Sequence, residues 1–145
     1  MQRVSLFLLL LLVFVSAPLV AGPKMNPTVT AFINAQAALA RKADPAFAGF
    51  DAGRGEKLYF GEHTHSEKQE ARSCVSCHKK DAKVAGSHAD TGKKIDAIAP
   101  VANKKRFTKE KEIRKWFGRN CKWVLERECT PLEKGDFLTW IYTLE

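Results

Sequence analysis

The sequence lacks several features that would each place it in a known class of protein. Its 145 residues contain no low-complexity stretch and no internal repeat with a period of roughly 20 to 50 residues, which argues against solenoids and arrays. No apolar run reaches the roughly 20 residues that span a bilayer. Methionine and cysteine are scarce, with two and four residues. A chain of this length is expected to form one domain.

The longest apolar run lies at the N-terminus and indicates export. Arg3 precedes an uncharged apolar segment from Leu6 to Val15, after which small residues and Pro18 follow. A basic start, a short apolar segment and small residues are typical of a secretory signal peptide, which we place at residues 1–21. We therefore expect a periplasmic protein, with an uncleaved membrane anchor as the alternative.

The charge balance of the chain is strongly basic. Lys and Arg number 24 against 16 Asp and Glu, a net charge of +8, of which the signal peptide holds only Arg3. In an exported protein this balance favours an acidic protein partner or a membrane surface and argues against nucleic acid. A solvated lysine face without a partner is the alternative.

Apolar spacing predicts two helices in the first part of the exported chain. Residues 27–42 carry apolar side chains at helical spacing, with Thr28 and Thr30 as candidate N-caps. Residues 51–60 predict a second helix, in which Gly55 and Tyr59 share one face. We interpret residues 22–50 as a helical extension or linker before the main domain.

Two further helices are predicted near the C-terminus. The first begins at Thr108 as N-cap, and Asn120 is expected to end it. The second opens at Thr130-Pro-Leu-Glu133, a capping box with Pro at the first helical position. No stretch has the pattern of a strand, so the predicted fold class is all-α.

The middle of the chain, residues 61–105, is rich in Gly, His, Ser, Lys and Asp and has no sustained apolar period. A loop of this length inside a compact domain is rare unless a ligand organises it. The sequence therefore predicts a bound group in this region.

Cys74-Val-Ser-Cys77-His78 identifies that group as a haem. The spacing CxxCH is that of covalent c-type attachment, in which two thiols on one turn bond to the porphyrin edge. His78 then supplies the proximal iron ligand. Two alternatives are a thioredoxin-like redox site, which needs a neighbouring βαβ unit, and a zinc site completed by Cys121 and Cys129.

Cys121 and Cys129 form an even pair in an oxidising compartment, so we expect a disulfide between them. Two buried free thiols are the alternative.

The sixth iron position is open to several candidates. Methionine is not among them, because Met1 belongs to the signal and Met25 is expected outside the folded body. The remaining candidates are His63, His65, His88, a Lys, an Asn, or no protein ligand. Two strong ligands, such as His78 with His88, would make a plain electron carrier, whereas a weak ligand would admit small gases.

Several stretches from about Asp51 to the C-terminus, about two thirds of the chain, resemble one family of cytochromes. They are Arg54-Gly-Glu, Thr91-Gly-Lys, Ile98-Ala-Pro100, Arg106-Phe-Thr108, Lys115-Trp-Phe-Gly-Arg-Asn-Cys121, Arg127-Glu-Cys-Thr-Pro131 and Glu133-Lys134. The family is that of the sphaeroides haem proteins, which are small, high-spin, oxygen-binding variants of class I cytochrome c. The run Arg-Asn-Cys with a second Cys eight residues on is its most specific element.

The resemblance implies a class I cytochrome c-like helical fold with long loops around one covalently bound haem c, in residues 51–145. It implies that Asn120 binds the oxidised iron and leaves on reduction, since an amide oxygen is a hard donor that suits ferric iron better than ferrous. It also implies that the Pro100 carbonyl orients His78, and that Gly55 and Tyr59 mark a helix crossing near Trp140.

The expected function is a monohaem electron-transfer cytochrome that binds O2, NO or CO once Asn120 has left. The resemblance implies a dihaem cytochrome c as electron donor, with membrane contact only through a membrane-bound donor. Three basic clusters are candidates for its docking surface: Lys79-Lys80, Lys93-Lys94 and Lys104-Lys105-Arg106. An enzyme that converts nitric oxide with bound oxygen is the remaining alternative.

Overall fold

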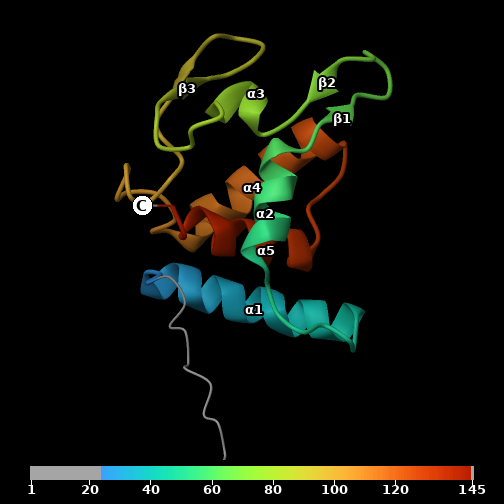
Figure 1. Cartoon of the computed structure of the whole chain (residues 1–145), viewed down its shortest axis with the longest axis vertical. Helices are drawn as coiled ribbons and strands as arrows, with labels where there is room; N and C mark the ends of the chain where they lie inside the picture. Colours follow the sequence, from blue (N-terminus) through green and yellow to red (C-terminus); the bar gives the residue numbers. More distant parts are fainter. Residues whose placement is uncertain (1–23, 145) are drawn as a thin grey trace, which may run out of the picture.

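The structure is a computed structural model that describes residues 24–144, and the predicted signal peptide lies outside the described residues. Figure 1 shows how the helices are arranged. They are α1 (Pro27–Ala43), α2 (Ala52–Phe60), α3 (Val75–His78), α4 (Glu110–Leu125) and α5 (Pro131–Ile141). Within the described residues, no helix is both long enough and apolar enough to cross a membrane. The predicted all-α class is confirmed.

The prediction that no strand forms is wrong for two short hairpins. β1 (His63–Thr64) pairs antiparallel with β2 (Ala71–Arg72), and β3 (Gly86–Ser87) pairs antiparallel with β4 (Lys94–Ile95). The two hairpins flank α3 in Figure 1. Strands of two residues are too short to show the alternation by which a strand is recognised in a sequence.

Helix α1 begins one residue after Asn26, whose side chain accepts a hydrogen bond from the Val29 N–H at 3.0 Å. The expectation that Thr28 or Thr30 caps the helix is wrong, because both lie inside it. Their hydroxyls instead donate to the Thr108 and Asn26 carbonyls. A cap must precede the first helical residue, and Asn26 is among the residue types preferred there.

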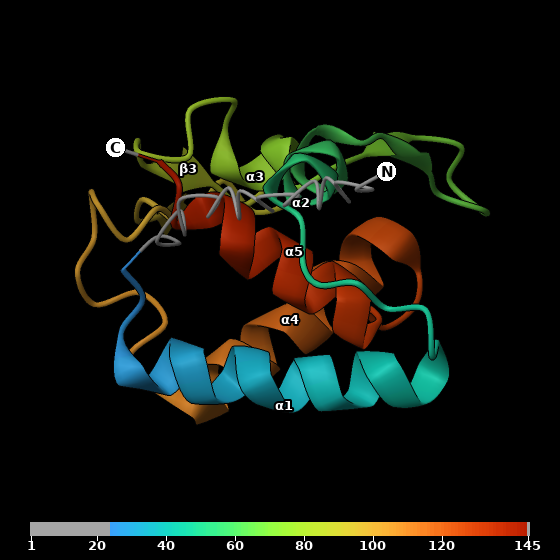
Figure 2. The ribbon, with the colours of Figure 1, turned by 60° about the horizontal axis from the view of Figure 1, so that its bottom comes forward.

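Helix α1 is part of the core rather than a free linker. Figure 2 shows α1 on one side of α4 and α5, with α2 and α3 on the other. Val29 and Phe32 of α1 are buried in the main apolar cluster. Met25 also packs against that cluster, so the expectation that it lies outside the folded body is wrong.

Helix α4 differs from its prediction at both ends. It follows Lys109 rather than Thr108, whose hydroxyl donates to the Lys105 carbonyl and closes the preceding turn. It continues past Asn120 to Leu125, because Cys121 and Val124 extend its buried face by another turn. Asn120 is therefore a residue of the helix interior and not its end.

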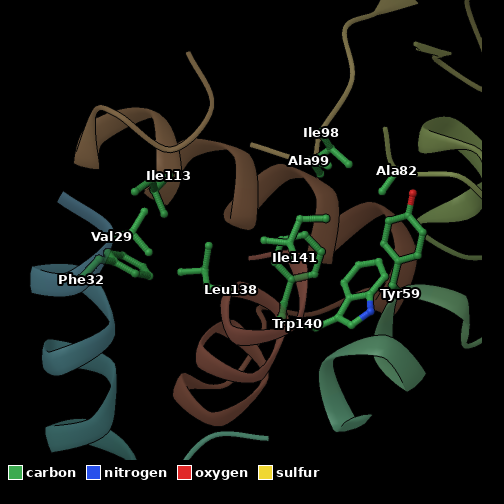
Figure 3. Packing of buried hydrophobic residues seen from close by; sticks show 11 residues of the cluster. Val29, Phe32, Tyr59, Ala82, Ile98, Ala99, Ile113, Leu138, Trp140 and Ile141 are labelled. Carbon is green, nitrogen blue, oxygen red and sulfur yellow. The ribbon is translucent and has the colours of Figure 1, made fainter. Parts of the chain in front are cut away.

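The crossing of α2 and α5 matches the prediction. A Cβ atom at Gly55 would lie 2.1 Å from the Asp136 carbonyl oxygen, so only glycine permits this approach. The Arg54 guanidinium binds both carboxylate oxygens of buried Asp136, at 2.7 and 2.8 Å. Figure 3 shows Tyr59 beside Trp140, and their ring centroids are 4.6 Å apart. The capping box that opens α5 at Thr130 and Glu133 is also confirmed.

Candidate haem site

Helix α3 gathers the three residues of the CxxCH motif on one turn. The Cys77 and His78 N–H groups both donate to the Cys74 carbonyl, at 3.3 and 2.9 Å. Neither Cys74 nor Cys77 is in a disulfide. Two thiols and an imidazole thus share a single short helical segment.

Tyr59 of α2 fixes the end of α3. Its hydroxyl donates to the carbonyls of His78, at 3.2 Å, and Lys79, at 2.7 Å. Burial keeps the pKa of Tyr59 above its ordinary value, so the hydroxyl retains the proton that it donates. The residue that positions the His78 backbone therefore comes from the helix that crosses α5.

The β3–β4 hairpin supports α3 from another side. A Cβ atom at Gly86 would lie 2.0 Å from the Cys77 carbonyl oxygen, so this strand approaches the motif as closely as backbone allows. The Ala89 N–H lies 3.3 Å from the Cys77 sulfur.

A cavity of about 690 Å³ opens beside α3, within the range of roughly 300–1,000 Å³ common for cofactor pockets. Cys74, Cys77 and His78 line one part of it. Many of the other lining side chains are apolar and come from α2, β4, α4, α5 and the loop before α4. They are Leu58, Ile95, Ile98, Phe107, Ile113, Trp116, Phe117, Trp123, Val124, Leu125 and Phe137. A large apolar cavity with two thiols and an imidazole fits a haem in size and in chemistry.

Burial sets the protonation state of two residues of the motif. Burial lowers the pKa of His78 to about 4, and the positive charge of Arg106 acts in the same direction. The imidazole is therefore neutral at neutral pH, which is the form that binds a metal. Burial raises the pKa of the Cys74 thiol to about 11.

Asn120 of α4 lines the same cavity as His78 of α3. Within residues 24–144 the Asn120 amide makes no hydrogen bond to the protein, so its oxygen is free to act as a ligand. His88, Lys93, Lys94 and Lys105 also line the cavity. His63 and His65 do not, and neither does Met25.

Cys121 and Cys129 are joined to each other in the structure, with their Cα atoms 5.5 Å apart. They are therefore not available to complete a zinc site with Cys74 and Cys77. Among the described residues, no cluster of three or more His, Cys, Asp or Glu side chains is arranged to hold a metal ion.

Pro100 does not line the main cavity. It lines a second pocket of about 260 Å³, together with Asn26 and Tyr142. No hydrogen bond joins Pro100 to His78 among the described residues, so the role of its carbonyl stays a prediction. Arg106 lines both pockets, and its guanidinium donates to the Ala97 carbonyl at 2.8 Å.

Sequence reasoning missed the role of Tyr59, which it assigned to helix packing alone. It also missed Arg72, whose side chain is buried and contacts Trp123 of α4. A tyrosine at a predicted helix crossing carries a hydroxyl that needs a partner when buried, and this signal could have revealed the role of Tyr59. No signal in the sequence indicates the contact of Arg72.

Comparisons with known proteins found a family profile and related proteins. A family profile described as "Domain of unknown function (DUF1924)" matches residues 45–141. The cytochrome c-type protein SHP of Cereibacter sphaeroides is 44% identical over 91 residues, which cover 63% of this chain and 69% of SHP. Cytochrome c'' of Methylophilus methylotrophus is 30% identical over 105 residues, which cover 72% of each chain.

Solved structures show the same fold. Oxidised SHP, described as an oxygen-binding cytochrome c, matches with a TM-score of 0.69 and 37% identity, over 79% of this chain and 96% of that one. Oxidised cytochrome c'' matches with a TM-score of 0.72 and 24% identity, over 79% and 92%. A solution structure of cytochrome c'', concerned with haem-ligand detachment, matches with a TM-score of 0.70 and 25% identity over the same shares.

The fold, the cavity and these relatives define a c-type cytochrome, with haem c as its cofactor and the predicted cytochrome c-like helical fold. The CxxCH motif in α3 is the sequence feature that is typical of this class. More particularly, the chain belongs to the SHP family, the family whose profile is described as DUF1924.

Replacing Tyr59 by Phe is expected to lower the free energy of unfolding by about 1–3 kcal/mol, because two carbonyls lose a buried donor. The Lys79 amide should also exchange its hydrogen faster. Urea unfolding and amide exchange of the holoprotein measure both effects. Tyr142→Phe is the control, because Asn26 keeps its bond to the Phe107 carbonyl there. Wild-type stability and exchange in Tyr59→Phe would contradict the assigned role.

Proposed function

We propose that this cytochrome is a periplasmic monohaem protein whose distal ligand, Asn120, leaves the iron on reduction, so that O2, NO or CO can bind. The observation that carries the proposal is that His78 and Asn120 line one cavity from two different helices. The free amide of Asn120 supports it further.

Each residue has a distinct part in this function. A bound haem would supply an iron that exchanges one electron and binds ligands from the protein. Cys74 and Cys77 bond covalently to one haem, and His78 binds the iron in its neutral form. The Asn120 oxygen is a neutral, hard donor whose affinity falls when the iron gains an electron. The apolar side chains of the cavity would favour a small apolar gas over water near a bound iron.

The relatives support ligand exchange as the function. SHP is described as oxygen-binding, and a cytochrome c'' structure is described in terms of haem-ligand detachment. An amide ligand that detaches would give this chain the same behaviour.

His88 is the reason for a second candidate function. It lines the same cavity as Asn120, and its Nδ1 accepts the Asp90 N–H at 3.2 Å. A second imidazole bound to the iron would give a plain bis-ligated electron carrier. This alternative predicts that His88→Ala, and not Asn120→Ala, changes the oxidised spectrum.

Periplasmic location is part of the proposal. The Cys121–Cys129 disulfide suits an oxidising compartment, and residues 1–21 have the composition of a signal peptide. The bond joins the last part of α4 to the loop just before α5 and so steadies the turn that carries Asn120.

We further propose that a redox partner with acidic side chains, such as a dihaem cytochrome c, docks beside the cavity. The predicted basic clusters supply the surface, since Lys79, Lys80, Lys93 and Lys94 are exposed. Lys93 and Lys94 also line the cavity mouth. Such charges speed encounter with an acidic partner more than they tighten the complex.

Covalent attachment predicts that the intact mass of the matured holoprotein exceeds that of the polypeptide by one haem. Cys74→Ala and Cys77→Ala should each retain a single thioether, and the double variant should lose its haem under denaturing conditions. Denaturing mass spectrometry measures all four proteins. A wild-type protein that sheds its haem on denaturation would refute covalent attachment.

Asn120→Ala is expected to change the oxidised absorption and electron paramagnetic resonance spectra while leaving the reduced spectrum unchanged, because the amide binds only ferric iron. Asn34→Ala is the matched control, since Asn34 is an exposed asparagine of α1 outside the cavity lining. An oxidised spectrum of Asn120→Ala identical to wild type would eliminate this ligand.

Docking predicts that reduction by a purified dihaem cytochrome c slows as ionic strength rises from about 0.01 to 0.15 M, since screening shortens the reach of the charges. Replacing Lys93 and Lys94 by Gln should slow the reaction at low salt. Replacing Lys42 and Lys111, which lie outside the cavity lining, removes the same charge and should have less effect. Stopped-flow rates that do not respond to salt would disprove the docking surface.

A further inference from the structure

Arg72 is a charged residue in an unusual place. It is only 5% exposed, and it lies two positions before Cys74. Its Nε donates to a carboxylate oxygen of Glu70 at 2.8 Å, within its own hairpin. Arginine is rarely buried to this degree unless it is paired, because desolvating the charge is costly, and Glu70 supplies the partner here.

The Arg72 guanidinium contacts α4 in two ways. It stacks over the Trp123 ring at 4.5 Å from the centroid, and its Nη1 donates to the Trp123 carbonyl at 3.1 Å. A planar guanidinium can stack and donate at once, which a lysine ammonium cannot do. A desolvated stack of this kind is also stronger than an exposed one.

Trp123 lies three residues after Asn120 in α4 and lines the same cavity. Its indole Nε1 donates to a carboxylate oxygen of Asp90 at 3.2 Å. The neighbouring residue, Ala89, contacts the Cys77 sulfur. Trp123 is therefore contacted by two segments. One contains Arg72, two residues before Cys74, and the other contains Asp90 and Ala89, the residue that contacts Cys77.

A third contact joins the first hairpin to the end of α4. The backbone N–H and the hydroxyl of Ser66 donate to the two carboxylate oxygens of Glu126, at 2.8 and 2.7 Å. Glu126 ends the helix with φ at 55°. The last turns of a helix are its least stable part, and these contacts hold them against the hairpin.

We propose that the contact between Arg72 and Trp123 positions Asn120 relative to the iron, by tying the final turns of α4 to the segment that carries the haem-binding cysteines. This inference rests on the proposed function, in which Asn120 is the ferric ligand. A neutral amide is a weak ligand, so its occupancy depends on being held close to the bound geometry before it binds. Arg72 acts through Asn120 and is a positioning residue.

The test compares Arg72→Met with wild type in two ligand equilibria of the holoprotein. Cyanide binding to the oxidised iron competes with Asn120, so loosening α4 should tighten apparent cyanide affinity by about tenfold, or about 1.4 kcal/mol. Carbon monoxide binds the reduced iron, from which Asn120 has already left. Its affinity should stay within about twofold of wild type.

Arg114→Met is the matched control, because Arg114, a residue of α4, also lies over an aromatic ring and pairs with a carboxylate. It lies outside the cavity lining and should change neither equilibrium. Arg72→Lys gives a second variant if Arg72→Met does not fold, because it keeps the charge but loses the stack. It should tighten cyanide binding in the same direction.

Asn120→Ala separates the outcomes. If Arg72 acts through Asn120, then Arg72→Met has no further effect on cyanide affinity in an Asn120→Ala background. Additive effects, or no tightening in the Arg72 variants, overturn the positioning role and leave the ligand assignment intact. If Asn120→Ala itself changes neither the oxidised spectrum nor cyanide affinity, the proposed function fails and this inference fails with it.

Discussion

The close approach of α2 and α5 at Gly55 determines where the haem motif lies. Because α2 rests directly on the α5 backbone, Tyr59 one turn later reaches the carbonyls that end α3. Arg54 holds the same crossing through buried Asp136. A side chain at Gly55 would push α2 outward, and the hydroxyl of Tyr59 would move away from His78 with it. The backbone of His78, the proposed iron ligand, is therefore positioned by a contact between two helices that do not carry the haem motif.

The cavity between α3 and α4 explains how so long an irregular segment can fold. Between α2 and α4, the buried apolar residues of the described structure are only Ala82, Ile98 and Ala99. Such a segment cannot exclude water by itself. The cavity walls are apolar, so a haem bound there would bury them and complete the core. Helix α4 also lines this cavity, and its last turns contact the first hairpin, carry one cysteine of the disulfide and hold Trp123.

The sequence predicted features that rest on local chemistry. The CxxCH spacing led to the motif in α3, the Thr130–Glu133 box located the start of α5, and Gly55 marked the crossing. Asn120 came from a family resemblance, and the structure places it in the cavity beside His78. Features that depend on tertiary packing were misjudged or missed. Helix α4 extends past Asn120 because Cys121 and Val124 are buried. Met25 packs on the core because α1 lies there. The contact of Arg72 joins two segments that are far apart in the chain.

Helix α1 packs against α5, and the Asn26 amide reaches the Tyr142 hydroxyl at 2.9 Å. The first and last helices of the described chain thus pack in the same core. Pairing such distant segments is entropically slow, and it needs both ends of the described chain to be present. Until these helices pair, Cys74 and Cys77 belong to an open polypeptide, so a haem could reach both thiols before the core closes.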